Sequence, residues 1–434
     1  MYSIIALNLL LLSIAVTADV DPILSYQPGT DMSSYLAIDL DMDSMAAGAS
    51  AYNYSMATKW YEEGGNSIKT SGSIRTIQKF STEAAKMTDE PFFALYSDFY
   101  QSVTYADDYV QQALTGTGLY APSSNPLISD VSRAQGITKG AQFLNTFMYV
   151  THEMYEALVD CNARIVGNHW DEALAFWVGT QAADSKGAMT GDLGFALAEK
   201  RAKNFGTTLN DDDDTLAQPY YVSVVNTKVF DLFNEGKTNS HEFKCTAMQQ
   251  NFDDLVAQMS IPFIQGYMKY IYEVSTTNSE KQRAELYLFC LALFPQVNAA
   301  SPAVYAMMEK SCNIRNEDML ADSYPDLKSN MESIYPQLRV SCGDIGGLLV
   351  SSDGTEYYTG AEPCCSSDCD GIGHGLFQAN PVAGAFLVLF IILFVVGGVF
   401  GGYYYYKVSK GEWGQAKHMI FEDETTSVME TGKV

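Results

Sequence analysis

One strongly apolar stretch of the sequence, HWDEALAFW at 169–177, begins with an imidazole and two carboxylates. If the stretch is a helix, His169 and Glu172 share a face, because residues three apart on a helix are neighbours. Asp171 lies in the same first turn. The residues after Glu172 are almost all apolar, which predicts a buried helix. Groups that can bind a metal ion therefore stand at the start of a helix that we expect to be buried.

The preceding segment offers further ligand groups. Apolar residues recur between Phe143 and Ile165 with the spacing of one helical face. If this helix and the next fold back as a hairpin, polar groups from both approach a common point, as in the metal sites of helix bundles. We therefore predict a metal site. Its six candidate ligands are Tyr149, His152, Glu156, His169, Asp171 and Glu172.

Structural roles account for the same residues. Asn168 and Asp171 fit a capping box at the start of the second helix, and a carboxylate such as Glu172 is favourable beside a helix N-terminus. His152 and Glu156 lie opposite the apolar stripe of their helix, which is usually a solvated face. Spacing alone leaves the metal site and the structural roles both open.

The residue types favour a hard cation. Ferric iron prefers carboxylate and phenolate oxygen with occasional imidazole, whereas copper or a softer metal favours histidine, methionine or thiolate. The chain has 28 Tyr and only 5 His. The residue types therefore favour a hard, highly charged cation such as Fe3+ over copper or a softer metal.

A second candidate site is the stretch KTSGSIRT at 69–76. Serine and threonine before a predicted helix, with Arg75 in its first turn, would form an anion seat from backbone N–H groups and a guanidinium. We predict that Ser73, Arg75 and Thr76 bind an anion such as carbonate beside the metal. Ordinary helix capping is the alternative.

Catalytic motifs are absent from the sequence. There is no nucleophile elbow, no phosphate-binding loop, and no E-x-x-H pair of the kind that di-iron carboxylate enzymes use. The stretch HEMYE at 152–156 lacks the second histidine of a zinc protease motif. The acidic run Asp211–Asp214 is better explained as a solvated loop than as a calcium site. We expect that the protein is not an enzyme.

The predicted fold class is mainly α. It comprises an ectodomain of helical-hairpin repeats or a helix bundle, a disulfide-rich juxtamembrane stalk and one transmembrane helix. Besides the two helices already described, helical patterns cover Ala46–Glu63, Thr76–Ala85, Leu193–Asn204, Cys245–Val274, Glu280–Leu293 and Val304–Cys312.

Apolar segments near both ends predict targeting to the cell surface. A short apolar run ends in small residues at Ala18, as in a signal peptide, and an uncharged run at 382–402 is long enough for a bilayer. Lysines follow the second run, which predicts a type I single-pass protein of the plasma membrane with an extracellular ectodomain. The expected domains are a signal peptide at 1–18, a helical iron-binding ectodomain at 19–342, a Cys-rich stalk at 343–380, a transmembrane helix at 381–402 and a cytoplasmic tail at 403–434.

Charge and cysteine content limit the partners and the compartment. A formal net charge of -26 argues against nucleic acid and anionic lipid as partners. All eight cysteines precede the apolar run at 382–402, on the oxidising side of the membrane, so we expect disulfides with a pairing that sequence leaves open. They are Cys161, Cys245, Cys290, Cys312, Cys342, Cys364, Cys365 and Cys369.

Four segments resemble a known family. They are YEEGGNS at 61–67, SIRT at 73–76, HWDEALAFWVG at 169–179 and AEKRAKNFGT at 198–207. They are similar to the algal iron-assimilating proteins, which include the low-iron-inducible periplasmic protein of green algae and the phytotransferrins of marine algae. The predicted C-terminal anchor resembles the phytotransferrin branch.

The resemblance implies a function. Members of this kind capture ferric iron at the cell surface, phytotransferrins bind carbonate together with the metal, and the loaded protein is internalised. We therefore expect high-affinity iron acquisition with carbonate as a synergistic anion and endocytic uptake, with a ferric reductase or the endocytic machinery as partners. The alternative is a non-catalytic acidic surface or adhesion receptor without a metal site.

Overall fold

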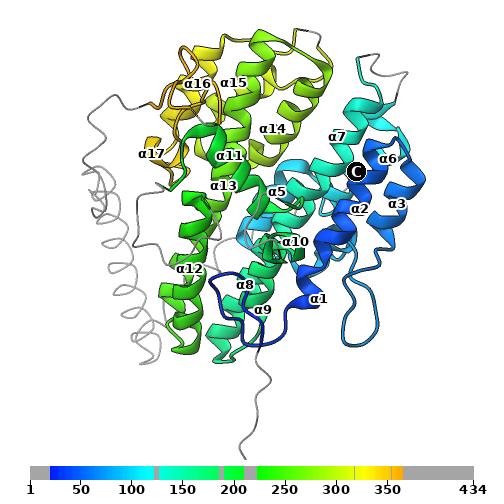
Figure 1. The fold of residues 1–434 in the computed structure, drawn as a ribbon, viewed down its shortest axis with the longest axis vertical. Coiled ribbons are helices and arrows are strands. Elements are labelled where there is room, and N and C mark those ends of the chain that lie inside the picture. Colours follow the sequence, from blue (N-terminus) through cyan, green and yellow to red (C-terminus); the bar gives the residue numbers. More distant parts are fainter. Residues whose placement is uncertain are drawn as a thin grey trace, which may run out of the picture. The chain divides into compact units, whose positions relative to one another are not determined.

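The protein is described by a computed structural model over residues 20–121, 127–184, 190–209, 222–316, 318–352 and 354–364 (Figure 1). These residues belong to one compact unit that ends at Ser367. Several predicted features lie outside the described residues. They are the signal peptide at 1–18, the acidic run Asp211–Asp214, Cys365, Cys369, the segment at 381–402 and the tail at 403–434.

The described chain is helical, and its only β-type pairings are isolated bridges. The first half contains α1 (Ser33–Leu36), α2 (Ile38–Ser50), α3 (Tyr54–Glu62), α4 (Lys79–Thr82), η1 (Ala84–Lys86), α5 (Pro91–Tyr100), α6 (Tyr105–Thr115), η2 (Gly118–Tyr120), α7 (Asp130–Gly140), η3 (Ala141–Thr146) and α8 (Phe147–Ala163). The second half contains α9 (His169–Val178), α10 (Thr180–Asp184), α11 (Gly194–Phe205), α12 (Val224–His241), α13 (Cys245–Thr276), α14 (Glu280–Ala300), α15 (Pro302–Ser311), α16 (Tyr324–Ser333) and α17 (Cys342–Ile345).

The mainly helical class is confirmed, but one component of the predicted fold class is wrong. That class included a transmembrane helix, whereas no helix in the part of the chain that the structure describes has both the length and the apolar character to cross a bilayer. The pattern of helices also differs in detail. The helix expected at Ala46–Glu63 is divided between α2 and α3, and the one expected at Thr76–Ala85 is reduced to the short α4 and η1.

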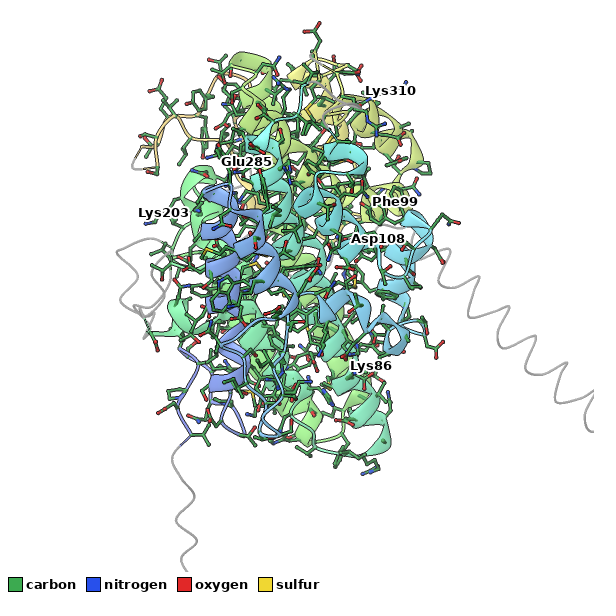
Figure 2. All side chains as sticks on the ribbon, turned by 90° about the vertical axis from the view of Figure 1, so that its right-hand side faces the viewer. Lys86, Phe99, Asp108, Lys203, Glu285 and Lys310 are labelled. Atoms are coloured by element: carbon green, nitrogen blue, oxygen red, sulfur yellow. A yellow bond between two sulfur atoms is a disulfide. The ribbon has the colours of Figure 1, made fainter. Side chains whose placement is uncertain are left out.

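The long helix α13 lies at the centre of the core. It packs against α8, α11, α12 and α14, and more than half of its residues are buried. Neighbours in sequence pack on one another in the pairs α2–α3, α8–α9, α12–α13 and α13–α14. Side chains fill the space between these helices (Figure 2), so the hairpins share one hydrophobic core.

The helix that carries most candidate ligands is the last part of a longer rod. From Asp130 to Ala163 the chain is helical throughout, and the six residues Ala141–Thr146 form a fully buried π-helical turn within it. The rod ends at Arg164, whose left-handed backbone conformation allows the chain to reverse. As predicted, α9 then folds back against α8.

Three disulfides link the described elements. Cys161–Cys245 joins the end of α8 to the start of α13, Cys290–Cys312 joins α14 to the end of α15, and Cys342–Cys364 closes the last described segment. That segment packs on the helical body, because the backbone N–H of Leu349 donates to the carbonyl of Asn204 at 2.8 Å.

Candidate metal centre

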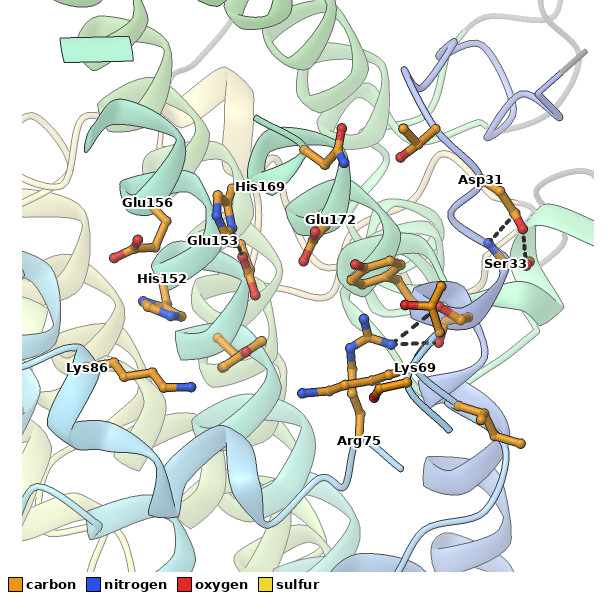
Figure 3. Close-up of a pocket in the computed structure, with 18 residues that line it drawn as sticks. Asp31, Ser33, Lys69, Arg75, Lys86, His152, Glu153, Glu156, His169 and Glu172 are labelled. Atoms are coloured by element: carbon orange, nitrogen blue, oxygen red, sulfur yellow. Dashed lines mark hydrogen bonds and ion pairs between the residues drawn. The ribbon is translucent and has the colours of Figure 1, made fainter. Parts of the chain in front are cut away.

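A pocket of about 1070 Å³ lies where α8 and α9 face α1 and the loop that precedes α4 (Figure 3). Helix α8 contributes four polar side chains to it, from Tyr149, His152, Glu153 and Glu156. Their spacing is i, i+3, i+4 and i+7, which places all four on one face of a helix. The face that sequence reasoning regarded as ordinarily solvated therefore lines a pocket instead.

The first cluster of possible metal ligands joins α8 to α9. One ligand atom from each of Glu153, His169 and Glu172 lies within 4.8 Å of the other two. The Nδ1 atom of His169 is 2.7 Å from a carboxylate oxygen of Glu153, which is buried. The second helix thus brings its imidazole and carboxylate onto the first, as the predicted hairpin requires.

The second cluster joins α8 to the start of α5. It consists of Glu90, His152 and Glu156, again with ligand atoms within 4.8 Å of one another. Glu90 and His152 are both buried and form a hydrogen-bonded ion pair. Burial raises the pKa of Glu90, and the carboxylate of Glu90 raises the pKa of His152 against the opposing effect of burial.

The first cluster holds its protons tightly. The hydrogen bond to Glu153 raises the pKa of His169 to about 9, despite partial burial. Burial, followed by the charge of Glu153, raises the pKa of Glu172. The pKa of Tyr35, on α1, is raised to about 12 by burial and by the neighbouring Glu172. Two carboxylates this close repel each other, so the cluster favours a proton or a metal ion between them.

Two tyrosines line the pocket beside the first cluster. Tyr149 lines the pocket and stacks on Phe80 with ring centroids 4.0 Å apart. Burial and the charge of Glu153 raise the pKa of its phenol. Tyr35 also lines the pocket, and the guanidinium of Arg75 lies over its ring. Phenol oxygens are thus available near both carboxylates of the first cluster.

Cationic side chains face the carboxylates across the pocket. Figure 3 shows Lys69, Arg75 and Lys86 on this side. The guanidinium of Arg75 lies 3.6 Å from the ring centroid of Tyr35 and donates to the hydroxyl of Ser34 at 3.4 Å. Lys86 forms an ion pair with Glu83.

Only one of the three predicted anion ligands lines the pocket. Arg75 does so, whereas Ser73 is exposed in the loop and Thr76 is buried, with its hydroxyl accepting from the backbone of Lys79. The seat predicted at a helix N-terminus is not formed, because α4 begins at Lys79 and is four residues long.

Asp171 points away from the pocket. Its carboxylate accepts hydrogen bonds from the hydroxyl of Tyr26 and, at 2.6 Å, from the backbone N–H of Gly29, and it is 3.4 Å from the ammonium of Lys237. The predicted capping box is also wrong, since the side chain of Asn168 makes no capping hydrogen bond. Asp171 instead ties the N-terminal segment to α9 and α12.

Five residues of the pocket and of the two clusters were missing from the predicted ligand sets. They are Glu153, Glu90, Tyr35, Lys69 and Lys86. Glu153 had a detectable signal, because it lies four residues after Tyr149 and three before Glu156, on the same helical face. Glu90 lies 62 residues from its partner His152, so no local spacing could have indicated it.

Comparison with known proteins supports a family assignment. The model of the Fea1 family, described as low iron-inducible periplasmic protein, matches residues 1–224, just over half of the chain. This range contains every residue that lines the pocket. No curated protein and no solved structure matches the chain. The phytotransferrin branch stays a prediction.

Proposed function

Because the chain belongs to the family of low iron-inducible periplasmic proteins, we propose that it binds ferric iron for high-affinity iron acquisition. The observation that carries this proposal is the cluster of Glu153, His169 and Glu172, whose ligand atoms converge within 4.8 Å inside a large open pocket. Iron is the cargo in this proposal, and no reaction is assigned to the site.

The donor set suits a hard trivalent cation. Two carboxylates offer oxygen ligands and partial charge neutralisation, and His169 offers one imidazole nitrogen. The phenols of Tyr35 and Tyr149 are the nearest further oxygen donors of the kind that ferric iron prefers. A bound cation would also relieve the repulsion between Glu153 and Glu172.

An anion would complete the charge balance. Arg75 lines the same pocket, and its charge offsets part of the rise that burial causes in the pKa of Glu172, so it lies close enough to influence that carboxylate. Carbonate could bind the metal and Arg75 at the same time, because its oxygens accept hydrogen bonds from a guanidinium. In this proposal the loaded protein is internalised, and acidification releases iron because protons compete with the metal for carbonate and carboxylate.

The test is metal analysis of the purified protein after ferric loading. Iron is supplied as a ferric hydroxamate complex, so that no carboxylate chelator is present, with and without bicarbonate. We expect about one ferric ion per chain with bicarbonate and much weaker retention after rigorous bicarbonate removal. Equal affinity in both conditions would exclude the carbonate part. Absence of stoichiometric iron in both conditions would favour the alternative of an acidic receptor without a metal site.

A further inference from the structure

The pocket is much larger than a ferric ion with one carbonate. A water molecule in the liquid takes up about 30 Å³, so the ion and its carbonate would replace only a few waters. The pocket has a volume of about 1070 Å³, comparable to the roughly 300–1,000 Å³ of sites that hold organic ligands of drug size. Most of its volume is therefore left for something larger.

The distribution of charge indicates what the larger ligand is. The possible metal ligands lie on α8 and α9, whereas Lys69, Arg75 and Lys86 lie across the pocket (Figure 3). Among the described residues, neither Lys69 nor Arg75 takes part in an ion pair within 4.0 Å. The hydrogen bonds from Arg75 to Ser34 are 3.4 and 3.5 Å long, at the weak end of the range. The N–H groups of both side chains can therefore donate hydrogen bonds to an anionic ligand.

The protein can bind the metal only if the chelator leaves some coordination positions on the iron free, and this excludes several classes of chelator. A chelator that occupies every position on the iron would leave no position for Glu153, His169 or Glu172. A neutral chelator would offer no carboxylate to the guanidinium of Arg75 or to the ammonium of Lys69. A hydroxycarboxylate with several carboxyl groups leaves coordination positions open on the metal and carries free carboxylates that suit guanidinium and ammonium groups.

We infer that the pocket takes up ferric iron together with a polycarboxylate of the hydroxycarboxylate class, with the metal at the Glu153, His169 and Glu172 side and the carboxylates at the Lys69 and Arg75 side. This inference rests on the proposed function. Carbonate then serves as the co-ligand when iron arrives without such a chelator.

The experiment uses the full chain and ferric citrate labelled in both the metal and the citrate carbon. After gel filtration we expect the protein to retain both labels in a constant ratio. Retention of iron without citrate would overturn the inference and leave the proposed function intact. Failure to retain iron from either citrate or the hydroxamate donor would instead remove the proposed function itself.

Variants test the basic side of the pocket. Lys69→Gln should weaken retention of labelled ferric citrate about two- to fivefold, because one exposed ion pair contributes an interaction free energy of that size. Arg75→Gln should weaken retention of labelled ferric citrate by about tenfold, because a guanidinium forms stronger paired hydrogen bonds with carboxylates than an ammonium group does.

The matched control is Lys59→Gln, which removes an exposed lysine of α3 that does not line this pocket. It should behave like the unmodified protein towards both donors. If Lys69→Gln and Arg75→Gln also retain ferric citrate like the unmodified protein, the basic side plays no part and the inference is wrong.

Discussion

Adjacent carboxylates in the first turn of α9 have different partners. Successive residues on a helix point about 100° apart. Glu172 therefore lines the pocket, while Asp171 is directed to Tyr26 and Gly29. The former is available to a metal ion, and the latter holds the N-terminal segment in place.

Exchanging each carboxylate for its amide separates these roles. Glu172→Gln should lower the affinity for ferric iron by at least tenfold with little change in melting temperature, because it removes an anionic ligand but keeps the shape. Asp171→Asn should keep the affinity and lower the free energy of unfolding by about 1–3 kcal/mol, the cost of a weakened buried hydrogen-bonded group. Iron titration and chemical denaturation measure the two effects. Loss of iron binding in a fully stable Asp171→Asn variant would contradict the assignment.

Residue spacing predicted part of this site. The i, i+3 relation placed His169 and Glu172 together, and the hairpin of α8 and α9 brought them to α8. Spacing could not separate the role of Asp171 from that of Glu172, because a residue in the first turn suits both a cap and a ligand. Arg75 lines the same pocket as the candidate ligands, but the local reason for expecting it there was wrong, since no helix begins beside it.

Helix α9 is positioned by a close contact with α12. The indole of Trp170 lies against Gly236, and a Cβ added to that glycine would be 2.1 Å from the ring. The indole N–H donates to the carbonyl of Phe233 at 2.9 Å. The residue beside His169 thus fixes how far α9 lies from α12.

Gly236→Ala should therefore displace α9. Overpacking of this kind costs roughly 1–3 kcal/mol, and we expect a loss of that size in the free energy of unfolding together with weaker iron binding. Gly343→Ala is the matched control, because the nearest atom to its added Cβ is 3.8 Å away. Equal stability of the two variants in urea titrations would show that the contact does not position α9.

Helical periodicity predicted the long core helices better than the short ones. The stretches that became α13 and α14 carry apolar residues over many turns, so their pattern was clear. The single helix expected at Ala46–Glu63 breaks at Tyr52, whose backbone is left-handed, and α3 begins after Asn53, whose side chain caps it. Gly48 then allows the backbone of Ala57 to approach closely, a contact between α2 and α3 that no periodicity contains. Helix α12 was missed because polar residues interrupt its apolar pattern.

The whole molecule is strongly acidic, and several of its ionisable groups are buried. The net charge is -26. Burial raises the pKa of Asp39 to about 6, and a hydrogen bond raises that of His169 to about 9. Both groups bind protons more tightly in the folded than in the unfolded state. The stability of the folded state should therefore increase as the pH falls from 9 to 5.

Asp39 provides a specific test of this pH dependence. One of its oxygens accepts from the backbone N–H of Gln181 at 2.7 Å, and the other has no hydrogen-bond partner within the described residues. Its raised pKa should make the protein about 1 kcal/mol more stable at pH 5.0 than at pH 7.5. Asp39→Asn should reduce the stability difference between the two pH values by that amount, whereas Asp43→Asn, at an exposed position of the same helix, should not. Chemical denaturation at the two pH values measures the free energy of unfolding of each variant. An unaltered pH dependence in Asp39→Asn would refute the raised pKa of Asp39.

The π-helical turn at 141–146 sets the direction in which the pocket-lining face of α8 points. Such a turn is equivalent to one additional residue within an α-helix, and each residue rotates the helix by about 100°. Loss of a single residue here would turn Tyr149, His152, Glu153 and Glu156 together away from α9 and towards other neighbours. An insertion or deletion in this buried turn would therefore disrupt the pocket without altering any of the residues that line it.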